Sequence, residues 1–232
     1  MMFSRPVKWG IGLPLFVLVV AVVAGLIWRG EYPTEQSVER SFVIEEDFTK
    51  VRKIMVRTNA AKEIVTMGGD SEFVEQKWND LDADPGIGAG VGDGAIAKAL
   101  LRNVIGDPNW ELRLEGDLKV RTLDDYVGKQ VVTLKQNVEI VPDHIQSDTK
   151  LVRGAGRLLG YAMVTRLERE EDHTRVRLKL TQKINTDAPW FAHGIADRRV
   201  RASVEQTLAN QEQAMRQLID ENRDQKWLLP LN

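Results

Sequence analysis

Two neighbouring stretches of the sequence decide the fold: RLLGYAMVTRLERE at Arg157–Glu170 and HTRVRLKLTQKI at His173–Ile184. Apolar and polar residues alternate along both, as they do in strands with one buried and one solvated face. The residues between them, Glu171 and Asp172, suit a tight polar turn. Pairing the facing ends of the two stretches brings inward residues together across the hairpin. The predicted pairs are Leu167 with Val176, Thr165 with Leu178, and Met163 with Leu180, while Glu168 lies beside Arg175 outside.

Outward from this hairpin, the alternation recurs along most of the chain. It predicts further strands at 40–45, 72–78, 110–122, 130–141 and 145–152. Helical spacing instead predicts two short helices, at 46–58 and 60–67, and a long C-terminal helix at 195–222. One apolar stripe follows the long helix and must be buried against the sheet. The stripe consists of Val200, Val204, Leu208, Met215, Leu218 and Ile219.

This order of elements resembles the helix-grip superfamily, also called SRPBCC, which includes START lipid-transfer domains, polyketide cyclase-like proteins and relatives of plant pollen allergens. The resemblance is carried by SFVIEEDFTKVRKIMV at Ser41–Val56, by the hairpin, and by RASVEQTLANQEQAMRQLI at Arg201–Ile219. It implies an α+β fold in which a curved antiparallel sheet of about seven strands surrounds a long C-terminal helix. The START-like domain would extend from 39 to 222, with an inserted segment at 80–108 and a tail at 223–232.

The resemblance also implies a cavity for a hydrophobic ligand between the sheet and the long helix. The inward positions of the strands are mostly apolar, with a few neutral hydrogen-bonding groups and no charged residue among them. The predicted pocket residues are Leu112, Leu114, Leu134, Gln136, Thr149, Tyr161, Met163, Thr165, Leu178, Leu180, Gln182, Val204 and Leu208. The same residues equally describe a filled core whose polar groups are satisfied.

The inserted segment begins with DLDADPGIGAGVGDGA at Asp80–Ala95, which imitates three ligand-binding motifs. A phosphate loop would need Lys and Ser or Thr after its last glycine, and a dinucleotide fingerprint would need a preceding strand. A calcium loop would need glycine where Pro85 stands. A short helix follows at 95–105, and its apolar side suits a lid over the cavity, a contact with lipid headgroups, or ordinary packing on the sheet edge. The predicted lid residues are Ile96, Leu100 and Val104.

The N-terminus carries an uncharged apolar run, WGIGLPLFVLVVAVVAGLIW, from Trp9 to Trp28. Twenty helical residues span about 30 Å, the thickness of a bilayer's hydrocarbon core, so we expect a transmembrane helix at 9–28. The leader at 1–8 is basic and is expected in the cytoplasm, which places the domain in the periplasm or outside the cell. Residues 29–38 are expected to form a linker. Cleavage as a secretory signal near Val22 and Ala24 is the alternative.

Composition excludes several classes of function. The chain of 232 residues contains no cysteine, so disulfides, thiolate metal sites and cysteine nucleophiles are absent. A net charge of -2 gives no general attraction to nucleic acid. His144 and His173 fall in predicted turns and His193 precedes the long helix, none of them at metal-ligand spacing. No metal, cofactor or catalytic residue is predicted.

These observations favour a membrane-tethered, non-catalytic binding module for a hydrophobic small molecule or lipid. Two alternatives remain open from the sequence. One is an envelope domain with a filled core that binds a protein partner of unknown identity, and the other is a cyclase-like enzyme with a polar pocket.

Overall fold

A computed structural model describes residues 18–20, 23, 30–83, 111–124 and 127–225. Its strands are β1 (Tyr32–Ile44), β2 (Ser71–Ala83), β3 (Leu112–Thr122), β4 (Val131–Ile140), β5 (His144–Leu151), β6 (Leu158–Glu170) and β7 (His173–Thr186). Its helices are α2 (Phe48–Arg57), α3 (Ala60–Gly68), the short 3-10 helix η1 (Trp190–Ala192) and α5 (His193–Asn222). The chain therefore has the predicted α+β class and the predicted order of elements.

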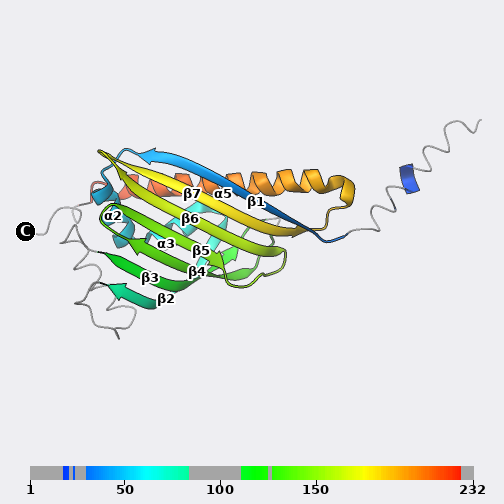
Figure 1. Ribbon diagram of the computed structural model, residues 1–232, viewed down its shortest axis with the longest axis horizontal. Helices are drawn as coiled ribbons and strands as arrows, with labels where there is room; N and C mark the ends of the chain where they lie inside the picture. Colours follow the sequence, from blue (N-terminus) through cyan, green and yellow to red (C-terminus); the bar gives the residue numbers. More distant parts are fainter. Residues whose placement is uncertain (1–17, 21–22, 24–29, 84–110, 125–126, 226–232) are drawn as a thin grey trace, which may run out of the picture.

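The strands form one antiparallel sheet in the order β1-β7-β6-β5-β4-β3-β2. Helix α5 lies along one face of the sheet, behind β1 and β7 in Figure 1. The predicted register of the β6–β7 hairpin is confirmed, because Leu167, Thr165 and Met163 pair with Val176, Leu178 and Leu180. Glu168 also pairs with Arg175, as predicted.

The apolar stripe of α5 is buried, as its spacing predicted. Each of its six residues is at most 2% exposed. Val204, Leu208, Met215, Leu218 and Ile219 join one core cluster, whereas Val200 joins a second cluster with Leu118, Val132 and Ile184. The buried stripe fixes the helix against β1, β7 and α3.

Two boundaries differ from the prediction by several residues. Strand β1 begins at Tyr32, so most of the segment expected to be a linker at 29–38 belongs to the sheet. Pro33 suggested a linker, but β1 is an edge strand, where a residue without an N–H group is tolerated. Strand β2 continues to Ala83, so the first residues of the predicted insertion are also in the sheet.

Other expectations lie outside the described residues. These include the rest of the insertion with the lid residues Ile96, Leu100 and Val104, and nearly all of the apolar run at 9–28. Within the described part of the chain, no helix combines the length and apolar character needed to cross a membrane.

Glu212 links α5 to β1. Its carboxylate accepts hydrogen bonds from Arg40 on β1 and from Arg216 on α5. Arg216 also donates to the carbonyl oxygen of Val43 at 2.8 Å and lies over the ring of Phe42. Burial opposes ionisation of Glu212, but the hydrogen bonds from the two arginines outweigh it and lower its pKa. The cluster holds the ionised carboxylate where the helix meets the edge strand.

Glu212→Gln should therefore destabilise the protein at pH 7, by about 1 to 2 kcal/mol, because it replaces two charge-assisted hydrogen bonds. The pKa of Glu212 is lower in the folded state, so its stabilisation is complete above the unfolded-state pKa and is lost as the pH falls through the folded-state pKa. Urea unfolding at several pH values should show that the difference in stability between wild type and Glu212→Gln narrows in acid. The matched control is Glu205→Gln, whose exposed carboxylate pairs with Arg201 on the same helix. An equal gap for Glu212→Gln at pH 3 and pH 7 would contradict this account.

Candidate ligand cavity

A cavity of about 410 Å³ lies between the inner face of the sheet, α3 and α5. Strands β3, β4, β5 and β6 supply half of its lining residues, and Met55 of α2, Ile64 of α3 and Met215 of α5 lie on the other side. Its lining is mainly aliphatic. Because α5 packs against β1, β7 and α3, and α2 reaches only β6 and β7, little of the inner face under β3 to β5 lies directly against a helix. The cavity occupies that space.

Most of the predicted pocket residues line this cavity. They are Leu112, Leu114, Leu134, Gln136, Thr149, Tyr161, Met163, Thr165 and Gln182. Four others do not: Leu178, Leu180, Val204 and Leu208 are fully buried in solid core. The reason is their position, since two lie on β7 and two on the stripe of α5, where helix and sheet are in direct contact. The predicted inward orientation was correct, but these positions are covered.

Neutral polar groups are set into the apolar wall. Gln136 accepts a hydrogen bond from Gln76 at 3.0 Å and donates one to the hydroxyl of Ser147 at 3.2 Å. Gln182 is nearly as buried as Gln136, and its Oε1 atom has no hydrogen-bond partner among the described residues. A buried amide oxygen without a partner is costly, so it is a ready acceptor for a donor group on a ligand.

Tyr161 contributes the only described phenol of the cavity wall. Its hydroxyl contacts the sulfur of Met163 at 3.4 Å. Burial raises the pKa of Tyr161 to about 12, with Asp70 adding to the shift and Gln211 opposing it. The phenol is therefore neutral at physiological pH and can donate a hydrogen bond, but it is poorly suited to act as a base.

Charged residues also reach the cavity, which the alternation of the strands did not predict. Arg57 ends α2, Asp70 precedes β2 and Asp124 follows β3, and all three are lining residues. Burial lowers the pKa of Arg57. Asp70 accepts a hydrogen bond from Asn210, and Asp124 accepts one from Ser203 at 2.6 Å. These contacts give the carboxylates a structural role. No sequence periodicity predicts that these three charged residues line the cavity, because they lie in loops or at a helix end.

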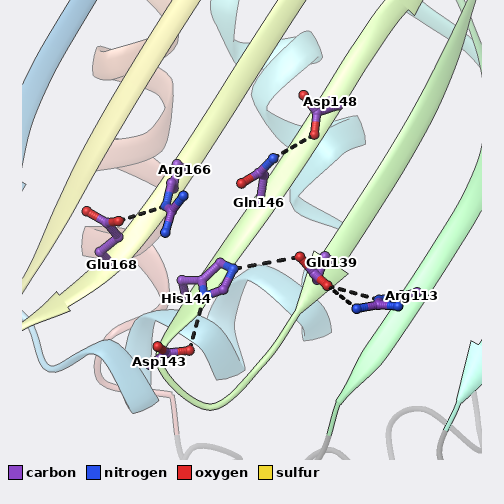
Figure 2. Close-up of polar contacts among 8 residues, drawn as sticks. All are labelled: Arg113, Glu139, Asp143, His144, Gln146, Asp148, Arg166 and Glu168. Carbon is purple, nitrogen blue, oxygen red and sulfur yellow. Dashed lines mark hydrogen bonds and ion pairs between the residues drawn. The ribbon is translucent and has the colours of Figure 1, made fainter.

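None of the three histidines lines the cavity. His144 belongs to a polar network on the outer face of the sheet, where Figure 2 shows it between Asp143 and Glu139. Glu139 in turn pairs with Arg113.

The other two histidines also lie away from the cavity. His173 lies near Glu45, and His193 stacks on Tyr32. Within the described ranges, no group of His, Asp or Glu residues is arranged to hold a metal ion.

Comparison with known proteins shows similarity in architecture alone. No protein-family model and no curated protein matches the chain. The solved structure of Ara h 8.0201 matches with a TM-score of 0.42 and 14% identity over 81% of this chain and 99% of the other. The Zhui aromatase/cyclase from Streptomyces sp. R1128 matches with a TM-score of 0.42 and 14% identity, over 83% of this chain and 97% of the other. Truncated norcoclaurine synthase from Thalictrum flavum matches with a TM-score of 0.42 and 11% identity, over 81% of this chain and 94% of the other.

At such identities and scores, the ligands and activities of those proteins do not carry over to this chain. The described residues themselves have the α+β helix-grip arrangement, a seven-stranded antiparallel sheet packed on a long C-terminal helix.

Proposed function

We propose that the protein is a membrane-tethered module that binds a hydrophobic small molecule or lipid in this cavity without transforming it. The observation that carries the proposal is the cavity itself. Its volume of about 410 Å³ lies within the range of about 300 to 1,000 Å³ typical of small-molecule sites. A domain that used its surface alone would gain stability by filling this space.

The lining supports a ligand that is largely apolar. Aliphatic side chains such as Leu114, Leu134 and Ile140 would cover its body. Gln182, Gln136 and Tyr161 would orient one polar end, because an amide or a neutral phenol can hydrogen-bond without carrying charge. A fatty acyl chain or fused-ring compound with a hydroxyl or carbonyl group fits this chemistry.

The tether is supported by the apolar run from Trp9 to Trp28, which is long enough to cross a bilayer. The basic residues Arg5 and Lys8 before it favour a cytoplasmic N-terminus. We propose that the cavity-bearing domain lies on the opposite side, in the periplasm or outside the cell. A ligand held there would stay close to the membrane from which an apolar molecule is drawn.

The test pairs native mass spectrometry with two substitutions on β5. The full chain, released gently from membranes, should carry a bound apolar compound. Thr149→Phe should reduce the bound fraction by tenfold or more, because it places a ring inside the cavity that Thr149 lines. Lys150→Phe is the matched control, since Lys150 is the exposed neighbour on the other face of the strand. Bare wild-type protein, or equal occupancy in both variants, would count against the cavity as the binding site.

A further inference from the structure

An exposed apolar patch marks the start of α5. Its members are Trp190, Phe191 and Ile195, which are 73%, 56% and 48% exposed. The rings of Trp190 and Phe191 meet edge to face, with centroids 5.8 Å apart. These side chains occupy η1 and the first turn of α5, so they project from helical backbone. We call this group the α5 patch.

The α5 patch is fixed beside the first residues of β1. The ring of Tyr32 stacks on His193 at 3.6 Å between centroids, and its hydroxyl bonds to Asp197 at 3.2 Å. Thr34, which is buried, donates to the same carboxylate at 2.5 Å. Figure 1 shows the start of β1 and the start of α5 at the same end of the molecule. The patch therefore lies where the chain enters the domain.

Chain length restricts how far this end can be from the apolar run. Only four residue steps separate Trp28 from Tyr32, which span at most about 14 Å even when fully extended. If the run crosses a bilayer, as proposed above, the α5 patch must stay within reach of the headgroup region. Tryptophan is favoured there because its ring is apolar and its N–H group can stay hydrated, and phenylalanine can bury its ring at the boundary with the acyl chains.

Neighbouring residues extend the same surface. Val152 and Leu159, at the turn between β5 and β6, are exposed at this end of the sheet. Arg198 and Arg199 are exposed on α5 within one turn of Ile195. Two acidic residues at this end are occupied, Asp197 by Tyr32 and Thr34, and Asp187 by Arg157 at 2.7 Å, whereas Glu31 is exposed beside Tyr32. This distribution suits contact with a bilayer that contains anionic lipid.

We propose that the α5 patch is a membrane-contact surface, which inserts Trp190 and Phe191 into the headgroup region of the bilayer that anchors the chain. The contact would hold the domain upright against the membrane at one end. It rests on the tether of the proposed function, but not on ligand binding. The occupant is lipid, and contact with a second copy of the chain is the competing outcome.

The absence of cysteine makes a direct test straightforward. Trp190→Cys and Ile195→Cys each provide a unique site for an environment-sensitive fluorophore in the full chain. The labelled protein is placed in vesicles of phosphatidylcholine and phosphatidylglycerol that contain a lipid with a nitroxide at the headgroup. Asp172→Cys is the control, because it lies at the other end of β7, about 40 Å away at the usual rise per residue.

The nitroxide lipid should quench the label at 190 and 195 severalfold more than the label at 172. Adding Trp190→Asp and Phe191→Asp to the Ile195→Cys chain should remove most of that difference. Equal quenching at 190, 195 and 172 would overturn the proposal. It would also be overturned if the label stayed shielded from solvent in detergent while the protein eluted as a dimer from a sizing column, because a second copy of the chain would then cover the patch. Flotation of the full chain with vesicles, measured in the same samples, reports the tether separately. Floating protein with an unquenched label refutes the patch but not the anchor.

Discussion

The variant Leu208→Asp should have no cooperative unfolding transition. Leu208 is completely buried in the middle of α5, in one core cluster with Leu178, Leu180 and Val204. Removing a buried leucine side chain costs about 2 to 5 kcal/mol, and a carboxylate without a partner at that site costs several more. Together these costs approach the whole net stability of a domain, about 5 to 15 kcal/mol. The carboxylate must stay buried without a partner or pull the helix off the sheet.

Thermal unfolding followed by near-ultraviolet circular dichroism measures this effect, because the signal depends on fixed packing around aromatic side chains. Ala202→Asp adds the same carboxylate to an exposed position of the same helix and should melt within a few degrees of wild type. Leu208→Ala should fall between the two, since it leaves a void without a charge. A cooperative transition of Leu208→Asp near the wild-type temperature would show that this part of α5 is not packed as described.

Sequence reasoning predicted the sheet well where burial alternates strictly. The β6–β7 register followed from one turn and one apolar face, because a slip by one residue would turn every inward side chain outward. The α5 stripe followed from helical spacing in the same way. These features are local consequences of which residues can be buried, so one sequence is enough to find them.

How deeply an inward residue is buried, and where loop residues lie, could not be predicted in this way. Alternation shows that Leu178 and Leu134 both face inward, but not that α5 covers the first and leaves the second on a cavity wall. The distinction depends on where the helix crosses the sheet. Asp70 and Asp124 were missed because a loop residue has no periodic signal. The early start of β1 was missed because edge pairing stabilises a polar strand through its backbone.

The start of β1 at Tyr32 leads to a second prediction with a large effect on stability. A chain shortened to begin at Glu39 loses Tyr32–Val38, which pair with Thr186–Leu180 of β7. It also loses the hydrogen bonds and stacking that join Tyr32 and Thr34 to Asp197 and His193. At about 0.5 to 1.5 kcal/mol for each hydrogen bond, the loss should reach about 3 kcal/mol or more. For a domain of this size, that lowers Tm by about 10 °C.

The matched control is a chain that begins at Gly30, which keeps all of β1 and also lacks the apolar run. Comparing melting temperatures of the two shortened chains therefore isolates the strand from the membrane segment. The chain from Glu39 should also aggregate on standing, because half of β7 becomes an unpaired edge. Equal melting temperatures would mean that Tyr32–Val38 acts as a linker after all. The α5 patch would then lose its fixed position beside the point where the chain enters the domain, since Tyr32 and Thr34 are what hold the start of α5 there.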